Sequence, residues 1–282
     1  MTLDEWKRLA LTLKQTYSPA PHIILWGGEP LVCPFFDELV EYLKALDFTL
    51  GLVTNGVLLD KHMDLCRRAF RTIYLSIDGP AHIHNAIRGE GVFEKVSKNL
   101  ALLSGGNAKV EVMSVLSPAL LDELDGFPEL MAEYGANSLL LQDYIQLSAQ
   151  EAYQYKKWMK ERFDTDAREI DAWVGQLPEH YPARKKAALQ SLLEKTHPIP
   201  VTYIPHHADG QCLSPCKHIH ISWNGDVMYC TDFYDFCAGN VRNEDIADIF
   251  ENEKTRRFRD ELHHNPTCAH CAWKNNKSFY LQ

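Results

Sequence analysis

The chain has 282 residues, 45% of them hydrophobic, and a formal net charge of −9 at pH 7. This size and composition suffice for one large domain and a smaller one, and the negative charge argues against a nucleic-acid partner or an anionic membrane surface. No apolar run approaches the roughly 18 residues of a membrane span, and the sequence shows no signal peptide. We therefore expect a cytoplasmic protein with no nucleic-acid and no membrane partner.

The first half of the chain alternates short apolar runs with amphipathic segments. A capping box from Thr2 to Glu5 predicts a helix that begins at residue 3. The run Ile23–Trp26 is continuously apolar, as expected of a strand buried on both faces. Further strands are predicted at 50–54, 73–77, 109–116 and 138–143, and further helices at 34–46, 60–70, 92–103 and 119–134.

This β–α alternation repeats every 25–35 residues or so, which predicts a parallel sheet with helical crossovers. Polar or flexible residues follow each predicted strand. In barrels and open parallel sheets the carboxyl ends of the strands line the active site. We therefore expect functional residues among Gly28, Glu29, Thr54, Asn55, Ser76, Asp78, Gly79, Ser114, Gln142 and Asp143.

Composition changes twice along the chain. Residues 148–205 have a charged, helical pattern and end in a stretch punctuated by prolines. Residues 206–282 are rich in cysteine, histidine and aromatic residues. Within this last segment Trp223–Asp226 contains Asn-Gly, a strong hairpin signal, which predicts strands at 218–222 and 227–230.

The eight cysteines are unevenly placed. Cys33 and Cys66 stand alone and are expected to be ordinary buried thiols, whereas the other six follow residue 211. In a cytosolic chain such clustering indicates metal rather than disulfides, and the spacing of Cys268 and Cys271 lets both sulfurs reach one centre. Thiolates suit either a [4Fe–4S] cluster or structural zinc. Five histidines keep zinc open: His206, His207, His218, His220 and His270.

Several short motifs occur here in a fixed order. Gly27-Gly28-Glu29-Pro30 follows the first predicted strand, and further motifs lie at 53–56, 75–79 and 84–93. The first resembles the GGEP motif of radical S-adenosylmethionine (SAM) enzymes, and the others resemble that family's next two βα units. The tail resembles the family's SPASM/Twitch auxiliary-cluster domain through Cys212, Gly225, Cys230, Gly239-Asn240 and Cys268-x-x-Cys271.

The resemblance implies an α/β fold. The expected architecture is a partial (βα)6 TIM-like barrel lacking its first strand, plus a small Cys-rich β-hairpin/helix C-terminal domain. The expected domains are a radical SAM-like partial barrel at 1–147, a helical linker region at 148–205 and an iron–sulfur domain at 206–282.

The resemblance also implies site residues. The backbone at Gly27 and Gly28, with Glu29, would hold the SAM amino group. Ser76 and Asp78 would lie near the ribose or carboxylate of SAM, and Arg88 is a further candidate for the carboxylate. One auxiliary [4Fe–4S] cluster would be held by Cys212, Cys230, Cys268 and Cys271, with Cys216 and Cys237 as alternates or neighbouring thiols. No catalytic residue is assigned.

The sequence departs from the family at one point. Radical SAM enzymes carry C-x-x-x-C-x-x-C after their first strand, where three cysteines bind three irons and the fourth iron binds SAM. Here no cysteine precedes Cys33. We expect that the first strand and its cluster loop are absent through truncation, with natural loss as the alternative. SAM binding is then expected to be weak or lost, and the chain to be inactive alone.

The function implied by the resemblance is a maturase that modifies a peptide or protein, with a reductant such as flavodoxin or ferredoxin as a further partner. Thr231, not Asp232, directly follows Cys230, which disfavours a sulfatase-maturing role. Two other functions stay open: a non-catalytic degenerate scaffold or electron-transfer module with one auxiliary cluster, and a zinc-tailed α/β binding protein. A doubly wound nucleotide-binding protein fits less well, because no glycine-rich phosphate loop follows a strand.

Overall fold

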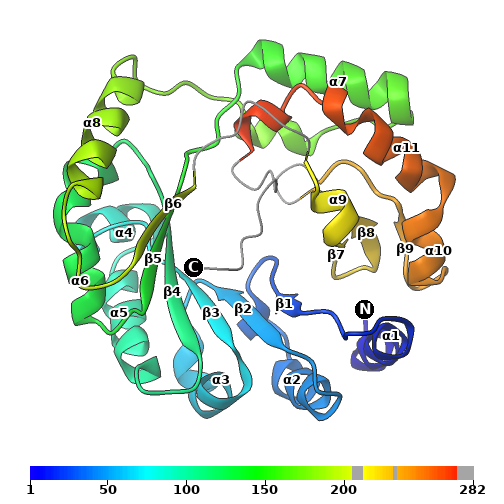
Figure 1. Cartoon of the computed structure of the whole chain (residues 1–282), viewed down its shortest axis with the longest axis horizontal. Coiled ribbons are helices and arrows are strands. Elements are labelled where there is room, and N and C mark those ends of the chain that lie inside the picture. Colours follow the sequence, from blue (N-terminus) through cyan, green and yellow to red (C-terminus); the bar gives the residue numbers. More distant parts are fainter. Residues whose placement is uncertain (205–211, 231–233, 272–282) are drawn as a thin grey trace. The chain divides into compact units, whose positions relative to one another are not determined.

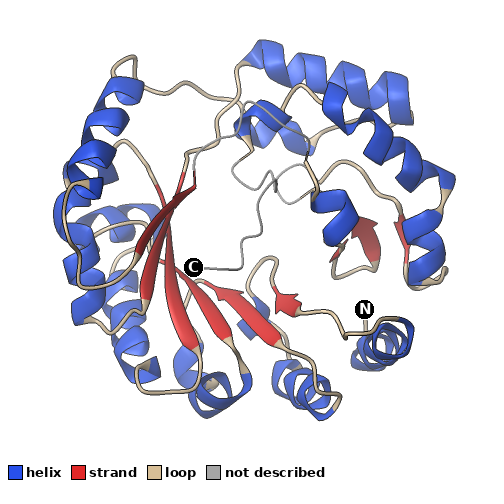
Figure 2. Cartoon of the chain, in the orientation of Figure 1, coloured by secondary structure: helices blue, strands red, loops and turns tan. Residues whose placement is uncertain are grey.

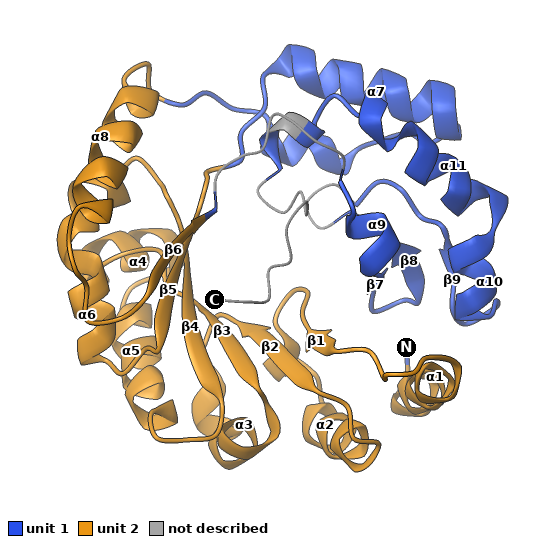
Figure 3. Cartoon of the chain, in the orientation of Figure 1, with its two compact units in different colours: residues 1, 145–177, 204–282 blue, residues 2–144, 178–203 orange. Residues whose placement is uncertain are grey.

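The structure is a computed structural model that describes residues 1–204, 212–230 and 234–271. The chain forms two compact units (Figure 3). The sheet unit comprises residues 2–144 and 178–203, and the tail unit comprises residue 1, 145–177 and 204–282. The region 148–205 contributes to both units. The three predicted domains, with boundaries after residues 147 and 205, stay a prediction.

The sheet unit is organised around a six-stranded sheet with the order β1-β2-β3-β4-β5-β6 (Figure 1). All neighbouring pairs from β1 to β5 are parallel, with Leu52 opposite Ile73 and Ile73 opposite Val110. This confirms the predicted α/β class and its parallel sheet. The strands are β1 (Ile23–Leu25), β2 (Leu50–Thr54), β3 (Thr72–Ser76), β4 (Lys109–Val115), β5 (Ser138–Gln142) and β6 (Val201–Ile204).

The connecting helices of this unit lie along one face of the sheet (Figures 1 and 2). The predicted capping box is present, since Thr2 N donates to Glu5 Oε2 and Glu5 N donates to Thr2 Oγ1. The core lies between helices and sheet, where Val40, Val96 and Leu139 are fully buried. The helices are α1 (Leu3–Thr16), α2 (Phe36–Ala45), α3 (Met63–Ala69), α4 (Ala81–Arg88), α5 (Val92–Leu103), α6 (Phe127–Glu133) and α8 (Tyr181–Leu193), with short 3-10 turns η1 (Pro30–Val32), η2 (Leu59–Lys61), η3 (Leu120–Asp122) and η4 (Leu124–Gly126).

Strand β1 differs from its prediction. The apolar run Ile23–Trp26 was expected to be buried on both faces, but Ile24 is 38% and Trp26 46% exposed. Among the described strands, β1 stands at the edge of the sheet and pairs only with β2. An apolar run indicates a strand, but the neighbours in the sheet decide its burial.

Three further elements differ from the sequence prediction. Strand β6 was not predicted, because its prolines favoured a linker, yet Leu139 N donates to Pro200 O beside it. Helix α4 was also missed. The single helix predicted at 119–134 is divided into η3, η4 and α6, because Pro128 is tolerated only in the first turn of a helix.

The tail unit combines helices with a small antiparallel sheet. The predicted hairpin is confirmed: His220 pairs with Met228, and Gly225 takes φ +92° in the turn. Aromatic rings form the core, with Phe236 stacked 4.1 Å from Phe258. The elements are α7 (Ala149–Phe163), η5 (Glu169–Trp173), α9 (Ser214–Lys217), β7 (His220–Ile221), β8 (Asp226–Met228), β9 (Gly239–Asn240), α10 (Ile246–Glu251), α11 (Glu253–Glu261), η6 (Leu262–His264) and η7 (Cys268–His270). In neither unit does a described helix combine the length and apolarity needed to cross a membrane.

Candidate functional site

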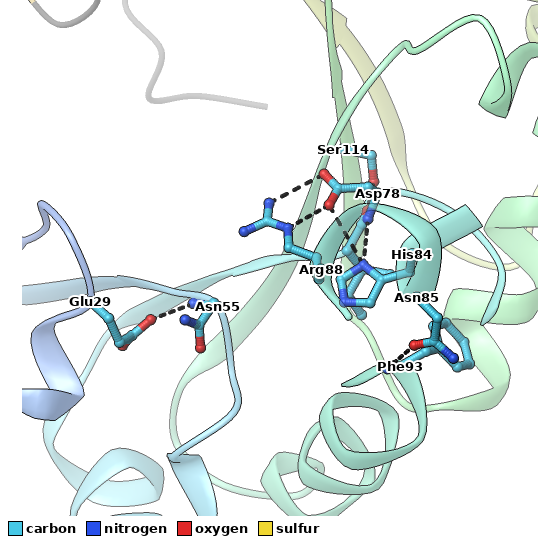
Figure 4. Close-up of polar contacts among 9 residues, drawn as sticks. Glu29, Asn55, Asp78, His84, Asn85, Arg88, Phe93 and Ser114 are labelled. Carbon is cyan, nitrogen blue, oxygen red and sulfur yellow. Dashed lines mark hydrogen bonds and ion pairs between the residues drawn. The ribbon is translucent and has the colours of Figure 1, made fainter. Parts of the chain in front are cut away.

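Glu29 ties the turn after β1 to the end of β2. One carboxylate oxygen, Oε1, accepts from Thr54 Oγ1 at 2.7 Å and from Leu31 N at 3.2 Å. The other, Oε2, accepts from Asn55 N at 2.7 Å (Figure 4). Hydrogen bonds to a carboxylate are stronger than those between neutral groups. This side chain therefore fixes the turn that carries the two predicted SAM-binding glycines.

Gly27 and Gly28 present their backbone to open space. Gly27 has φ +106°, a conformation that favours glycine. A Cβ added at either residue would meet no described atom within 4 Å. A ligand can therefore approach this backbone closely, and the turn fits the predicted contact with the SAM amino group.

Asp78 and Arg88, which were predicted as separate SAM contacts, form one ion pair. Asp78 follows β3 and is only 7% exposed. Arg88, at the end of α4, donates from Nε to Oδ2 at 2.7 Å and from Nη2 to Oδ1 at 3.3 Å (Figure 4). Such a two-point contact fixes the guanidinium plane. The Arg88 side chain remains 37% exposed, so Asp78 presents a fixed cation at this edge of the sheet.

His84 supports the same loop from below the surface. Its ring is 1% exposed, and Nδ1 accepts from the backbone N–H of Asp78 at 3.1 Å. The proton of the neutral ring is therefore on Nε2, which has no hydrogen-bond partner in the described part of the chain. Burial lowers the pKa of His84, and Arg88 adds to this, while Asp78 opposes it.

The remaining strand ends complete this edge. Ser76 is the half-buried last residue of β3, and Ser114 on β4 donates from its hydroxyl to Ile77 O. Asp143, after β5, is 4% exposed and accepts from Lys185 Nζ at 2.7 Å and from the Tyr203 hydroxyl at 2.8 Å. Lys185 and Tyr203 were missed by the sequence analysis. They come from α8 and β6, and no local motif links them to Asp143.

In the tail unit all six predicted cysteines lie among the described residues, and none of them forms a disulfide there. Cys216 is exposed, Cys271 is buried, and Cys212, Cys230, Cys237 and Cys268 are intermediate. Of the two isolated cysteines, Cys66 is buried as predicted, whereas Cys33 is intermediate.

Two of the predicted ligands influence one buried phenol electrostatically. Burial raises the pKa of Tyr155 on α7, and the thiols of Cys230 and Cys268 add to that effect. Across the described residues, no three His, Cys, Asp or Glu side chains are grouped as a metal site, and the predicted ligand set stays a prediction.

Only some of the five histidines predicted as alternative zinc ligands lie among the described residues. His206 and His207, like Thr231 and Asp232, lie outside the described residues. Burial lowers the pKa of His218 and lowers that of His220 to about 4. Both rings are therefore neutral at pH 7, the form in which histidine binds metal.

The Cys268–Cys271 pair is anchored to the first turn of α7. His270 lies between the two cysteines, and its Nε2 is 2.6 Å from Glu151 Oε1. Glu151 also forms the capping box of α7 with Ser148. The contact was not predicted, because Glu151 is distant in sequence from the cysteines.

Arg259 on α11 carries an unsatisfied buried group. Its Nε donates to Pro215 O at 3.1 Å, and its guanidinium lies 3.9 Å from the centre of the Phe250 ring and 5.7 Å from that of Tyr229. Nη2 is buried and has no hydrogen-bond partner among the described residues. A buried N–H without an acceptor is costly. The unsatisfied N–H of Arg259 therefore fits a bound anionic group such as a thiolate-ligated cluster.

Comparison with known proteins matches both units' motifs to family models. The model of the radical SAM superfamily matches residues 1–123. The SPASM model, an iron–sulfur cluster-binding domain, matches residues 212–272. The two matches occur in the order that the sequence motifs predicted.

Named relatives and solved structures agree with these matches. AdoMet-dependent heme synthase of Oleidesulfovibrio alaskensis is 25% identical over 98% of this chain and 73% of that protein. Mycofactocin maturase MftC of Mycobacterium tuberculosis is 34% identical over 41% of this chain and 30% of that protein. The crystal structure of Streptococcus suis SuiB has a TM-score of 0.65 at 12% identity, over 90% of this chain.

The chain spans 60% of the SuiB chain, and at that identity the likeness shows the fold alone. It confirms the predicted TIM-like radical SAM fold. The two matched domains are of types that use SAM and iron–sulfur clusters. The chain therefore carries a radical SAM domain at residues 1–123 and a SPASM iron–sulfur cluster-binding domain at residues 212–272.

Proposed function

We propose that this protein acts in a radical SAM reaction on a peptide or protein substrate, as a maturase. The observation that carries the proposal is the turn at Gly27 and Gly28, which Glu29 holds open at the strand ends. The substrate class is supported by the relative named Mycofactocin maturase MftC. A SuiB structure bound to the precursor peptide SuiA shares the fold, with a TM-score of 0.65.

Each residue has a role in binding or orientation. The Gly27–Gly28 backbone contacts the SAM amino group, and Ser76 lies near its ribose or carboxylate. Asp78 orients Arg88, whose exposed cation pairs with the SAM carboxylate. When bound, SAM and a reduced cluster supply one-electron hydrogen-abstraction chemistry. Cys212, Cys230, Cys268 and Cys271 would hold one auxiliary [4Fe–4S] cluster, which would supply electron-transfer chemistry with a flavodoxin or ferredoxin as reductant.

This chain by itself binds SAM weakly and does not cleave it. It contains no C-x-x-x-C-x-x-C motif, so three of the thiolates that hold the SAM-binding cluster in this family are absent. The proposal therefore predicts SAM affinity without formation of 5′-deoxyadenosine under dithionite. Chromatography of the reaction mixture checks this, and release of 5′-deoxyadenosine would disprove the inactivity.

The binding site is tested by isothermal calorimetry with SAM. Glu29→Ala removes the contacts to Thr54 and Asn55 and frees the turn, so we expect SAM to bind about tenfold more weakly, a loss of roughly 1.4 kcal/mol. Glu38→Ala, at an exposed position on α2, is the matched control and should bind SAM like the unaltered chain. Equal affinity of Glu29→Ala and the unaltered chain would remove the basis of the assignment.

A second candidate function is suggested by the share of this chain that each relative covers. The heme synthase relative aligns over 98% of this chain, whereas MftC aligns over 41%. The alternative substrate is therefore a heme precursor of the tetrapyrrole class. Selection of a displayed random-peptide library on the SAM-loaded chain should yield a consensus sequence if the substrate is a peptide. A saturable shift of a porphyrin absorption band, without a peptide consensus, would favour the alternative.

A further inference from the structure

We propose that Arg259 is the positively charged partner of the tail's iron–sulfur cluster and that its Nη2 donates a hydrogen bond to a cluster or cysteine sulfur. The inference rests on the auxiliary cluster of the proposed function. It adds a residue outside the cysteine motifs, which sets the cluster's reduction potential and helps to retain its iron.

The placement of Arg259 follows from two neighbours of the predicted ligands. Its Nε is bonded to Pro215 O, and Pro215 directly precedes Cys216 in the α9 segment that follows Cys212. Its guanidinium also lies over the ring of Tyr229, which directly precedes Cys230. One side chain therefore contacts both arms that carry the hairpin-side cysteines. Stacking on Phe250 at 3.9 Å fixes the plane of the guanidinium.

The charge of Arg259 has no described counter-ion. On the same helix, Arg256 pairs with Glu251 at 3.3 Å on the exposed surface. The described ion pairs of the tail unit include none with Arg259, and its Nη2 is buried and unpartnered. The Arg259 side chain as a whole is half-buried, but its buried Nη2 costs free energy until it finds an acceptor. Since two of its neighbours, Pro215 and Tyr229, directly precede Cys216 and Cys230, a thiolate-ligated anionic cluster supplies the missing acceptor.

This pairing has a direct electrochemical consequence. One-electron reduction makes the cluster more negative, so a nearby fixed cation stabilises the reduced state. Net charge and hydrogen bonds to sulfur are among the factors that set the potentials of iron–sulfur clusters. Removing the charge should therefore make the cluster harder to reduce.

The test compares Arg259→Gln with the unaltered iron-loaded chain by potentiometric titration followed by EPR spectroscopy. We expect the ratio of reduced to oxidised cluster at a fixed potential to fall about tenfold, which is 59 mV for a one-electron couple. Arg256→Gln removes the same charge from the exposed face of α11 and is the matched control. The proposal fails if Arg259→Gln leaves the potential unchanged, or if Arg256→Gln lowers it equally.

A conservative variant and a labelling experiment guard against misfolding. Arg259→Lys keeps the positive charge but not the planar guanidinium. Its cluster should have a reduction potential close to that of the unaltered chain, but it should lose iron to a chelator faster. In the unaltered protein carrying ¹⁵N-guanidino-arginine, the reduced cluster should show a ¹⁵N hyperfine coupling. Arg259→Gln should abolish that coupling, and absence of coupling in the unaltered protein would overturn the proposal.

These readouts separate this inference from the proposed function. None of them requires SAM cleavage or a substrate. If the chain has a normal cluster but binds neither SAM nor peptide, the maturase proposal is refuted. The proposed role of Arg259 can still be tested on that cluster. Zinc without iron in the purified chain would refute both the cluster and its cationic partner.

Discussion

The candidate sites in the two units differ in how their charged groups are satisfied, although the sheet unit also holds a buried neutral atom without a described partner, Nε2 of His84. In the sheet unit, the carboxylates of Glu29, Asp78 and Asp143 all accept hydrogen bonds from protein donors. In the tail unit, a guanidinium N–H of Arg259 is buried without an acceptor among the described residues.

This difference has a physical meaning. A site whose charged side chains are paired keeps its geometry without a ligand, and it presents its open backbone and the exposed face of Arg88. A site with unsatisfied groups gains more stability from its ligand, because binding removes a desolvation cost. We therefore expect the sheet unit to be organised before SAM binds, and the tail unit to depend on its cluster.

The largest expected effect tests this dependence at the cysteine pair. The double substitution Cys268→Ala with Cys271→Ala removes two of the four proposed thiolates, so we expect loss of the roughly four irons of one cluster. Iron analysis and the absorption spectrum after anaerobic reconstitution measure this. The tail should also lose thermal stability, because metal binding is coupled to folding.

The matched control is Cys33→Ala in the sheet unit, outside the predicted ligand set. It should retain all the iron, and both variants should bind SAM with unchanged affinity. Iron retained after the double substitution would refute the ligand assignment. A parallel loss of SAM affinity would show that the sheet-unit site is not organised by itself.

The fold was predictable where pattern and local chemistry agree. The strands β2 to β5, the capping box at Thr2 and the Asn-Gly hairpin all have short-range signals. Strand β6 was not predictable in this way, because its pairing with β5 joins distant segments across prolines. The exposure of β1 likewise depends on the order of strands, which no local pattern encodes.

A smaller effect is expected at the ion pair of the sheet unit. Asp78→Ala leaves Arg88 without its anion and should lower the free energy of unfolding by about 2 kcal/mol. The loss is below that of a fully buried pair because Arg88 is partly exposed. Urea unfolding with hydrogen exchange on the β3 amides measures it. Asp60→Ala, which breaks the exposed pair with Lys95, should cost at most about 1 kcal/mol; equal losses would show that the Asp78–Arg88 pair has no special role.

The sequence predicted which residues stand at the strand ends, but it did not predict which of them pair with one another. Glu29, Asp78 and Arg88 stand in motifs, yet only the fold shows that Asp78 is committed to Arg88. Arg259 stands in a charged stretch of α11 with no distinguishing pattern, and the burial of its Nη2 depends on contacts with Phe250, Tyr229 and Pro215 that no local pattern encodes. Sequence motifs therefore identify groups that contact a cofactor, whereas the groups that support those contacts require the structure.

The smallest expected effect is a pH dependence centred on His84. Burial lowers the pKa of His84 in the folded chain, so below the unfolded value of 6.5 the unfolded state binds a proton that the folded state excludes. The free energy of unfolding should therefore fall as the pH drops below about 6.5, by at most about 1.4 kcal/mol per pH unit for this one group. His84→Gln keeps an acceptor for the Asp78 N–H and has no titrating ring. Its unfolding free energy, measured in urea from pH 7 to pH 5, should decline less steeply than that of the unaltered chain. Identical slopes would mean that the loop accommodates a protonated ring, and the sheet-unit site would then be less rigid than its hydrogen bonds indicate.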